Sequence, residues 1–451
     1  MLILHRMRFW FRLFFYYGFA HYWPVSCFPV VSKEVRHHCR WESGAGGRVE
    51  KAGSDGRSLA GRRAEPEFMR VLVLVSHYPT EAFPNQGTFY RNWVEALMRC
   101  GAEVEVKVVA PWIPPGLARV WERVRRRQLE YRSRFCGTAP VGHVHFLRLP
   151  GNWHLPYCMA AAVRRRVAQR PDIVHSHYGF AAGLAGARVA RRLGIRSVLT
   201  LHGSDINTVP LAGGKFRRWT RKAVLGNDAV VAVSEALRVR TCELFGRSPV
   251  HLPIGVNLRA YENLPAQLEA RQQLGLPPDK KLLLYVGNVV ESKGINELIE
   301  ALKVTSPHRA WGVVVGSGPL VDLVQRTDRC TYCGRQPNER IPLYMRAADV
   351  FVLPSYSEGL PTVLVEAGAA GTPAIGTAVG GIPELLSQDR GRMIPPRSPE
   401  LLAEAIRDCL NCPAEALARA DHLRQYIREH YDADANARRM MVLYGDLIGK
   451  G

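Results

Sequence analysis

Two glutamates, Glu358 and Glu366, stand eight positions apart in the stretch "PSYSEGLPTVLVEAG" (354–368). A Gly-Leu-Pro turn separates them, and an apolar run precedes the first of them. Two carboxylates at such a spacing could serve as the acid and base of a reaction, could hold the hydroxyl groups of a ligand, or could be ordinary surface charges. Which of these applies depends on the elements that carry the two side chains.

The turn between the two glutamates has the residues of a helix start. Gly359 permits a turn that a Cβ atom would obstruct, and Pro361 fixes φ at the first helical positions. The free N–H groups and the dipole at a helix N-terminus attract anions, so a phosphate suits this turn. Glu358 then lies in the loop beside the anion. Glu366 lies further into the helix, where it could also be a simple surface charge.

Two further strand ends carry a polar side chain next to a glycine. Lys293 precedes Gly294 and a predicted helix in "YVGNVVESKGINELIEAL", and a cation at a helix start suits the neutralisation of phosphate. His202 ends the apolar run of "SVLTLHGSD". Taken alone, Lys293 could be a solvated lysine and His202 a structural histidine. Their shared position directly after a strand favours a site.

Glycines at two more strand ends are expected to face the same site. Gly87 lies between the first predicted strand and the first predicted helix, and Gly316 begins "GSGP" in the second half of the chain. No Walker A sequence occurs, and no G-x-G-x-x-G follows the first strand. The sequence therefore disfavours a P-loop enzyme and a dinucleotide-binding enzyme.

The ten cysteines are scattered along the chain and show no disulfide framework, which fits a reducing compartment. Two Cys-x-x-Cys pairs occur, Cys330/Cys333 and Cys409/Cys412, but the gap between the pairs is much longer than in a zinc ribbon. We therefore expect neither a metal nor a redox site at these cysteines.

Two other groups of potential metal ligands are also set aside. His175 and His177 are expected to face opposite sides of a strand, which argues against a shared metal ion. Asp432 and Asp434 form a D-A-D sequence, but they lie in a C-terminal stretch with a helical pattern. The sequence therefore predicts no metal site.

Short apolar, β-branched runs alternate with helical stretches twice along the chain. In the first half these runs are residues 70–76, 103–110, 143–149, 172–177, 197–202 and 228–234, and in the second half they are 281–287, 311–316, 329–334, 349–355 and 372–377. Continuous apolar strands between helices predict a parallel sheet that is covered on both faces. A Pro-punctuated stretch, 263–281, is expected to link the two halves.

The predicted fold class is therefore α/β, with two doubly wound, Rossmann-like parallel sheets that face each other across a central cleft. At 451 residues the chain is long enough for roughly two or three domains of ordinary size. In open parallel sheets, ligands bind outside the carboxyl ends of the strands. The side chains singled out above follow strands or open helices, so we expect them to gather at that cleft.

Positive charge is concentrated in the middle of the chain. Residues 70–260 carry 29 Lys and Arg against 11 Asp and Glu, whereas residues 261–451 carry 21 against 23. The stretch 119–134, "RVWERVRRRQLEYRSR", holds seven Arg with interleaved apolar side chains. This segment suits the anionic face of a membrane, with a solvated basic face as the alternative. Nucleic acid fits less well, because no reading motif accompanies the charge.

The first 68 residues differ from the rest of the chain. Residues 8–23 are aromatic and apolar, but Arg12 interrupts them well short of the roughly 18 to 20 residues that a membrane-spanning helix needs. Residues 32–67 are rich in Gly, Arg and Ser without periodicity, which predicts disorder. We expect Met69 to be the true start and residues 1–68 to be an upstream extension. A membrane-associating tail is the alternative.

Several motifs occur in the order of a known family. "LHGSD", "VSEALR", "PIGVNLRAY", "YVGNVVESKGINELIEAL", "VVVGSGPL" and "ADVFVLPSYSEGLPTVLVEAGAAGTPAIGTAVGGIPELL" together resemble the retaining nucleotide-sugar glycosyltransferases of family 4, which have the two-domain GT-B architecture. The likeness runs from about residue 70 to about residue 445, and its last block is highly specific. The segments around "GTFYRNW" and "YVGNVVESKG" are most similar to the branch that includes the teichuronic-acid enzyme and related cell-envelope transferases.

The resemblance implies roles for the two glutamates and the turn between them. Glu366 matches the second glutamate of the family's E-x7-E motif, which is expected to hold the ribose hydroxyls of the nucleotide. Glu358 matches the first glutamate, which is expected to contact the transferred sugar near its reacting carbon. Gly359, Leu360 and Pro361 match the loop whose backbone meets the diphosphate and the sugar.

The other residues of interest also have counterparts in the family. Lys293 matches the cationic ligand of the diphosphate, and His202 matches the histidine that touches the donor sugar. Gly87 matches the N-domain glycine that lets the backbone approach the phosphates. Where the family usually has an Arg directly after "YVG", this chain has Asn288. The loss of one cation could cost roughly a few kcal/mol of catalysis, unless a neighbouring Arg compensates or Lys293 and the helix dipole suffice.

The resemblance further implies front-face transfer with retention of configuration. A nucleoside diphosphate, expected to be UDP, departs as an acceptor hydroxyl attacks from the same face. No cofactor and no metal are implied, since the nucleotide-sugar is a substrate. The expected partners are this donor, a polyprenyl-diphosphate-linked or glycan acceptor and an anionic membrane surface, but no nucleic acid. The expected location is cytoplasmic, peripheral at the inner face of the plasma membrane.

In domain terms we expect residues 69–260 to form the acceptor-side domain and residues 261–425 the nucleotide-sugar-binding domain. Residues 426–451 are expected to form a helix that returns to the N-terminal domain. Three other classes are weighed: a glycosidase, a nucleotide-sugar epimerase and a non-catalytic sugar-nucleotide-binding protein. A glycosidase would not need a lysine and a helix N-terminus for phosphate. An epimerase would convert the donor without any acceptor, and Asn288 is the best support for a binding protein.

Overall fold

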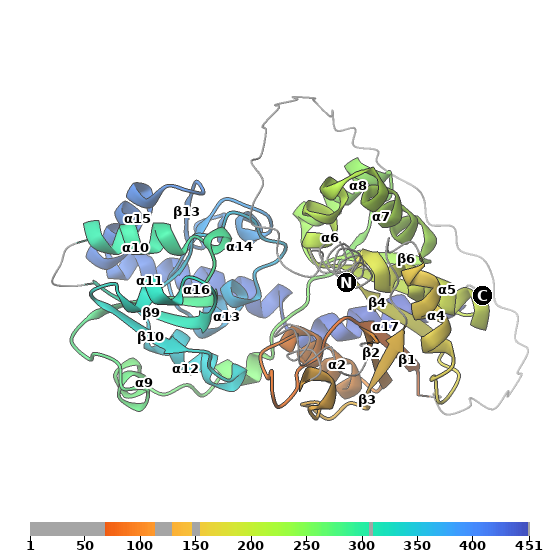
Figure 1. Ribbon diagram of the computed structural model, residues 1–451. Helices are drawn as coiled ribbons and strands as arrows, with labels where there is room; N and C mark the ends of the chain where they lie inside the picture. Colours follow the sequence, from red (N-terminus) through yellow and green to blue (C-terminus); the bar gives the residue numbers. More distant parts are fainter. Residues whose placement is uncertain (1–67, 113–128, 147–153, 306–309, 450–451) are drawn as a thin grey trace, which may run out of the picture.

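The protein consists of two α/β domains, each built on one parallel sheet (Figure 1). The computed structural model describes residues 68–112, 129–146, 154–305 and 310–449. The first sheet has seven strands in the order β3-β2-β1-β4-β5-β6-β7, and the second has six in the order β10-β9-β8-β11-β12-β13. Neighbouring strands run parallel throughout both sheets. The predicted fold class is confirmed.

The N-terminal domain is formed by most of the first half of the chain and by one helix from its C-terminal end. Its strands are β1 (Arg70–Val75), β2 (Glu103–Pro111), β3 (Val141–Phe146), β4 (Ile173–His177), β5 (Arg196–Leu201), β6 (Ala229–Ala232) and β7 (Val250–His251). Its helices are α2 (Thr88–Arg99), α4 (Leu155–Arg164), α5 (Leu184–Leu193), α6 (Ser204–Asn207), α7 (Gly214–Gly226), α8 (Glu235–Phe245) and α17 (Ala433–Gly449).

Strand β1 is apolar after Arg70 because both faces of the stretch from Val71 to Val75 are covered. Val71, Val73 and Val75 belong to a buried cluster that also contains residues of helices α2 and α17. Leu72 and Leu74 belong to a second buried cluster, which contains residues of α4 and α5. Burial of apolar surface on both faces of the sheet stabilises this strand at its centre.

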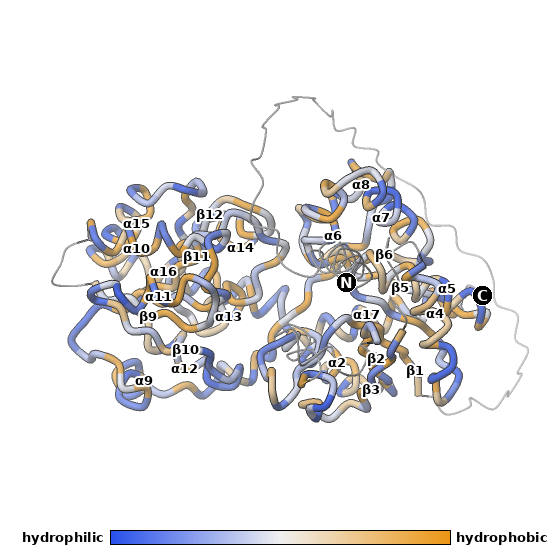
Figure 2. The backbone as a smooth tube through the Cα atoms, viewed as in Figure 1, coloured by the Kyte–Doolittle hydropathy of each residue, from blue (hydrophilic) through white to orange (hydrophobic). Residues whose placement is uncertain are grey.

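The C-terminal domain repeats the same alternation. Its strands are β8 (Lys281–Asn288), β9 (Ala310–Ser317), β10 (Cys330–Gly334), β11 (Val350–Leu353), β12 (Ala374–Thr377) and β13 (Arg392–Ile394). Its helices are α9 (Gln267–Leu274), α10 (Ile295–Val304), α11 (Val321–Gln325), α12 (Ile341–Ala347), α13 (Thr362–Ala370), α14 (Ile382–Leu386), α15 (Pro399–Asn411) and α16 (Pro413–His430). One continuous apolar cluster joins these elements, and Figure 2 shows hydrophobic strands in the middle of both domains.

The stretch 263–281, which lies within the predicted bounds of the second domain, was expected to be a linker but is packed into that domain. It contains α9, which packs against α12, and Ala270 of α9 is fully buried. Arg271 reaches from α9 to Asp349, with 2.6 Å between the guanidinium nitrogen and the carboxylate oxygen. The prediction was wrong because the prolines flank a short helix rather than mark a free linker.

The chain crosses between the domains at two adjacent segments. Leu252 and Ile254 pack in the N-terminal core, whereas Val256 packs in the C-terminal core. The N–H group of Val256 donates to Tyr431 O at 2.9 Å, and the N–H group of Ala433 donates to Val256 O at 3.1 Å. The outgoing and returning segments therefore run side by side and are hydrogen-bonded to each other.

Helix α17 lies in the N-terminal domain, where it packs against α2 (Figure 1). Its residues Ala437, Met440 and Tyr444 are buried in the core of that domain. Asp434, from the D-A-D sequence, forms an ion pair with Arg99 of α2 at 2.6 Å. This ion pair adds to the apolar contacts that hold α17 against the N-terminal domain.

Two strands were not predicted from the sequence. Strands β7 and β13 are two and three residues long, and each is the outermost strand of its sheet. Such short edge strands carry too few residues for a periodic pattern. Among the described residues, no helix is long and apolar enough to cross a membrane. The expectations for residues 1–67 concern a segment outside the described residues and stay predictions.

His175 and His177 of β4 face the same side of the sheet, contrary to our prediction. Their rings stack with centroids 4.7 Å apart, and Trp93 packs edge-on against both. The prediction was wrong because successive strand residues alternate in direction, so residues two apart share a face. Burial lowers the pKa of His175 to about 3 and that of His177 well below its ordinary value, so both rings are neutral.

Candidate active site

The carboxyl edges of the two sheets face each other and are in contact. In the loop after β1, the side-chain nitrogen of Asn85 donates to Gln336 O in the loop after β10, at 2.5 Å. Arg91 of α2 forms an ion pair with Glu339 across the same junction, at 2.9 Å. This junction is where the sequence predicted the cleft.

Two glycines make a close approach across the junction. Gly203, after β5, has a φ of +130°, and a Cβ atom on it would lie 2.8 Å from Gly359 Cα. A Cβ atom on Gly359 would lie 2.0 Å from His202 O. Because these separations are too short for a side chain, the two loops can meet only with glycine at both positions. Asn207 adds a hydrogen bond from its side-chain nitrogen to Glu358 O at 3.4 Å.

Glu358 and Lys293 are joined as an ion pair. The Nζ atom of Lys293 lies 2.6 Å from Oε1 of Glu358, and the two side chains are 27% and 9% exposed. Opposite charges shielded from water to this degree depend on each other, because removal of one leaves the other uncompensated. The sequence placed both residues near an anion site but did not predict their direct contact.

The loop that carries this lysine is fixed against the end of β11. Gly294 has a φ of +72°, and a Cβ atom on it would lie 2.0 Å from Pro354 O. The N–H group of Tyr356 donates to Ser292 O at 2.9 Å. The loops that follow the neighbouring strands β8 and β11 are thereby fixed to each other. Because Lys293 and Glu358 lie in these two loops, their side chains are kept close together.

Helix α13 begins directly after Pro361, as the turn residues predicted. The N–H group of Leu364 donates to Pro361 O at 3.0 Å, which closes the first turn of the helix. The N–H groups before it are not needed within the helix, and together with the helix dipole they favour an anion. Leu360, in the preceding loop, packs against the cores of both domains.

Glu366 lies inside α13 and is only 8% exposed, so the surface-charge alternative does not hold. Among the described residues, no hydrogen-bond donor contacts its carboxyl group. Burial raises the pKa of Glu366 to about 8, so the group holds its proton at neutral pH. Buried carboxyl groups without a protein partner are rare, because nothing compensates the loss of water.

His202 is held at the junction by a buried aspartate. The N–H groups of His202 and Gly203 donate to Asp205 Oδ1 at 3.1 and 2.9 Å, and the N–H group of Gly179 donates to Oδ2 at 3.3 Å. Burial raises the pKa of Asp205 to about 6, while these backbone donors act in the opposite direction. Asp205 therefore ties together the loops that follow β4 and β5.

Sequence reasoning missed two residues that support His202. Asp205 stands three residues after it in "LHGSD", which is a spacing at which an aspartate side chain caps a turn, so a signal was present. The second residue is His177, whose Nδ1 lies 2.8 Å from Nε2 of His202. No local pattern indicates this contact, because it joins residues on two different strands.

Gly87 and Asn288 also lie at the carboxyl edges. Gly87 precedes α2 with a φ of +78°, and a Cβ atom on it would lie 2.9 Å from both His77 Cδ2 and Tyr90 Cδ2. Asn288 ends β8 and is exposed, and its backbone oxygen accepts a hydrogen bond from the hydroxyl of Tyr285 at 2.7 Å. All sequence-predicted site residues are thus found on the two facing edges.

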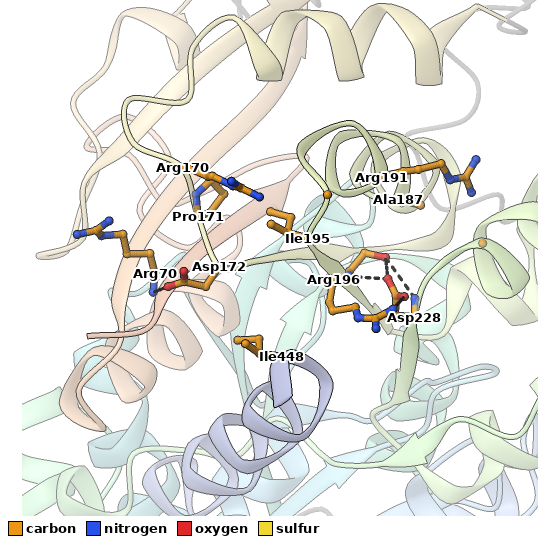
Figure 3. A pocket seen from close by; sticks show the side chains of 13 residues that line it. Arg70, Arg170, Pro171, Asp172, Ala187, Arg191, Ile195, Arg196, Asp228 and Ile448 are labelled. Atoms are coloured by element: carbon orange, nitrogen blue, oxygen red, sulfur yellow. Dashed lines mark hydrogen bonds and ion pairs between the residues drawn. The ribbon is translucent and has the colours of Figure 1, made fainter. Parts of the chain in front are cut away.

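A cavity of about 730 Å³ lies at the opposite, amino edge of the N-terminal sheet (Figure 3). Several of its polar side chains already have partners. The N–H group of Arg70 donates to Asp172 at 2.7 Å, and Arg196 forms an ion pair with Asp228 at 3.2 Å. None of the predicted site residues line this cavity. The predicted site residues therefore lie away from this cavity, at the carboxyl edges of the two sheets.

The potential metal ligands are dispersed in the part of the chain that the structure describes. No three His, Cys, Asp or Glu side chains come together there in a way that could hold a metal ion. The cysteines of both Cys-x-x-Cys pairs are free thiols, with Cys409 buried and Cys412 exposed.

Comparisons with known proteins identify the family. Residues 86–259 match the family described as Glycosyltransferase Family 4, and residues 266–430 match Glycosyl transferases group 1. TuaC of Bacillus subtilis, a glycosyltransferase named for teichuronic acid biosynthesis, is 35% identical over 385 residues, which covers 83% of this chain and 98% of TuaC. The chain belongs to the family 4 glycosyltransferases. Membership supports a transferase and disfavours the glycosidase alternative.

Solved structures share the fold of this glycosyltransferase. A sucrose-phosphate synthase from Thermosynechococcus elongatus has a TM-score of 0.69 at 22% identity, and the match covers 85% of this chain and 100% of the synthase. Anabaena HepE, in complex with UDP-glucose, has a TM-score of 0.66 at 19% identity, with 84% and 100% covered. These likenesses confirm the GT-B architecture.

Replacement of Glu366 by Gln should change how the stability of this glycosyltransferase depends on pH. The folded protein keeps the carboxyl proton up to about pH 8, whereas the unfolded chain loses it near the ordinary value of 4.5. Unfolding therefore releases a proton in this range, and Glu366 lowers the free energy of unfolding as pH rises, by up to about 1.4 kcal/mol per pH unit. Glu366→Gln should accordingly gain stability relative to the wild type across the range.

Urea unfolding at a series of pH values measures this difference. Glu300→Gln, at an exposed position of α10, is the matched control and should show no such trend. If the difference in the free energy of unfolding between Glu366→Gln and the wild type stays constant with pH, the raised pKa of the buried carboxyl group is contradicted.

Proposed function

We propose that this glycosyltransferase moves a sugar, with retention of configuration, from a UDP-sugar to a lipid-linked or glycan acceptor in the synthesis of a cell-surface polysaccharide. The observation that carries the proposal is the grouping, along α13 and the loop before it, of a buried carboxyl group, an ion pair and a helix start that favours an anion. The ribose, the sugar and the diphosphate of a nucleotide-sugar each have a matching group there. TuaC is named for teichuronic acid biosynthesis, which supports a cell-surface polysaccharide as the product. HepE is solved with UDP-glucose, which supports a UDP-sugar as the donor.

In the proposed complex the diphosphate lies between Lys293 and the N-terminus of α13. Departure of the nucleotide leaves negative charge on the phosphate, which a fixed cation and a fixed helix dipole stabilise without rearrangement. Lys293 and the N-terminus of α13 together remove the need for a metal ion. We propose that Arg335 supplies the positive charge of the arginine that the family usually has at the position of Asn288. Arg335 follows β10, and its Nε donates to Ser317, which is the register partner of Asn288.

The buried carboxyl group of Glu366 suits the ribose. An ionised carboxylate can accept hydrogen bonds from two adjacent hydroxyl groups, and these bonds compensate the loss of water that raises its pKa. Binding of the nucleotide therefore favours the ionised form of Glu366. The free protein holds this group in an unfavourable state, and the ligand relieves it.

Glu358 and His202 are proposed to contact the transferred sugar. They stand on opposite sides of the junction, one from each domain. In the proposed reaction the bond between the anomeric carbon and the diphosphate oxygen breaks while the acceptor oxygen bonds to the same face of that carbon. The acceptor proton passes to the departing phosphate. Glu358 stabilises the positive charge that develops on the sugar ring.

We further propose that the N-terminal domain docks on an anionic membrane surface at the cytoplasmic face, where lipid-linked acceptors are found. Most of the segment expected to do this, 119–134, lies outside the described residues. Helix α7 offers a similar surface and contains no acidic residue. Its exposed basic residues are Lys215, Arg217, Arg218, Arg221 and Lys222. Leu211 and Leu225, which are 69% and 42% exposed, lie beside them in the chain and suit the same surface.

The proposed activity is tested by incubation of the protein with a panel of nucleotide-sugars and isolated membrane lipid. We expect consumption of a UDP-sugar that requires the lipid, proceeds in the presence of EDTA and gives a product with the anomeric configuration of the donor. Conversion of the donor without an acceptor would indicate an epimerase. Binding of UDP without turnover would indicate a sugar-nucleotide-binding protein, and either result would overturn the proposal.

The two glutamates should differ in what they contribute. Glu366→Ala should weaken binding of UDP by roughly 10- to 100-fold, because it removes hydrogen bonds from a charged acceptor worth about 1.5–3 kcal/mol. Glu358→Ala should leave UDP binding within a few-fold and should lower the transfer rate by about 100-fold. Calorimetric titration and initial rates measure the two effects, with Glu300→Ala as the control. Equal weakening of UDP binding by both substitutions would refute this division of roles.

The membrane surface is tested with vesicles of phosphatidylglycerol and of phosphatidylcholine. R217A/R221A should lower partition onto the anionic vesicles by roughly 30-fold, since each basic residue near the surface contributes about 1 kcal/mol. Added salt should weaken binding of the wild type. The matched control is R407A/R428A, which removes two exposed arginines of the C-terminal domain. Equal losses in the two double variants would show a general effect of net charge rather than a docking surface.

A further inference from the structure

A pair of histidines connects the candidate active site with the interior of the N-terminal domain. Nδ1 of His177 and Nε2 of His202 are 2.8 Å apart, which is the distance of a hydrogen bond between the two rings. His177 ends β4 and is fully buried, whereas His202 is partly exposed at the domain junction. Burial lowers the pKa of both rings well below the ordinary value, and the neighbouring histidines add to this. Both rings are therefore neutral.

Two neutral rings can share this hydrogen bond in only two ways. In the first, His177 donates from Nδ1 and His202 accepts at Nε2. In the second, His202 donates from Nε2 and His177 accepts at Nδ1. In the second arrangement His177 carries its own proton on Nε2. That atom is buried and has no hydrogen-bond partner, while the rings of Tyr90 and Trp93 pack edge-on against His177.

A buried N–H group without an acceptor is tolerated less well than a buried lone pair without a donor. The geometry therefore favours His177 as the donor. His202 then carries its proton on Nδ1, and among the described residues this nitrogen has no hydrogen-bond partner and is not buried. A histidine side chain in water prefers its proton on Nε2, so the contact with His177 imposes the less common form.

The surroundings of His202 leave its ring little freedom. Phe89, Tyr90 and Tyr178 lie against it, with ring centroids 5.2, 5.8 and 4.7 Å away. Its backbone N–H group is bound to Asp205. The ring is thus held in one orientation, with Nε2 toward the interior and Nδ1 on its accessible side.

We infer that His177 is a positioning residue that fixes the neutral Nδ1–H form of His202 and so presents a hydrogen-bond donor, rather than a base, to the donor sugar. The role at the sugar rests on the proposed function, whereas the position of the proton does not depend on it. A fixed N–H group can stabilise a sugar oxygen without a change of protonation during the reaction. A base at this place would not be required, because the departing phosphate takes the acceptor proton.

The position of the proton is tested in the protein labelled with ¹⁵N at its histidine rings. A protonated and a bare ring nitrogen have well-separated ¹⁵N resonances, and His202→Gln assigns the signals of His202. We expect a protonated Nδ1 and a bare Nε2 for His202 in the free wild-type protein at neutral pH. A proton on Nε2 of His202 would overturn the inference, whatever the protein transfers.

Two variants at position 177 test whether His177 causes this state. His177→Asn keeps an N–H donor near the position of Nδ1 and should keep the wild-type signals. His177→Asp places an acceptor instead of a donor near the position of Nδ1, and should draw a proton to Nε2 of His202. Unchanged signals of His202 in a folded His177→Asp variant would overturn the inference. If that variant does not fold, the wild-type and His177→Asn spectra still decide.

Transfer kinetics then connect the proton with activity. His177→Asp should lower kcat roughly tenfold, because the proton that Nδ1 of His202 offers is drawn to Nε2, with little change in the dissociation constant for UDP. His177→Asn should keep most of the rate, and His430→Asp, on the exposed surface of α16, serves as the control. Equal losses in the Asp and Asn variants would mean that His177 acts only in packing. An absence of transfer in all variants would count against the proposed function and would leave the spectra decisive.

Discussion

The parallel direction of the strands is the constraint on which the site depends. In a parallel sheet every strand ends at the same edge, and the helix that follows usually begins there, so side chains from distant parts of the chain come together without any local signal. Two such edges face each other in this protein. His202 comes from one edge, and Lys293, Glu358 and Glu366 come from the other. Gly203 and Gly359 let the two edges touch, because neither presents a Cβ atom to the other.

The same edges collect groups that are unfavourable in the free protein. Glu366 is buried without a partner, and Asp205 is buried with only backbone donors around it. A buried charge away from these edges can be matched directly, as Arg271 is by Asp349. Unfavourable groups of this kind cluster at functional sites, and the surrounding core must hold them in position. The large apolar clusters on both sides of each sheet have this supporting role.

The sequence predicted the features that depend on residues close together in the chain. Continuous apolar strands indicated two covered parallel sheets, and the turn at Gly359 and Pro361 correctly marked the start of α13. It did not predict contacts between residues distant in the chain, such as the ion pair of Lys293 with Glu358 or the contact of His177 with His202. The edge strands β7 and β13 were too short to leave a pattern, and prolines concealed α9. The orientation of His175 and His177 was available from strand periodicity but was derived wrongly.

The position of α17 has a consequence for how the chain folds during its synthesis. The ribosome releases the first sheet long before α17, yet Ala437, Met440 and Tyr444 of α17 cover one face of that sheet. The N-terminal domain therefore keeps an apolar face uncovered while the C-terminal domain is still being made. The usual order, in which the first domain completes its fold first, does not apply to this chain. A nascent chain that stops before residue 433 would expose this face, and it is at this stage that a chaperone would be most needed.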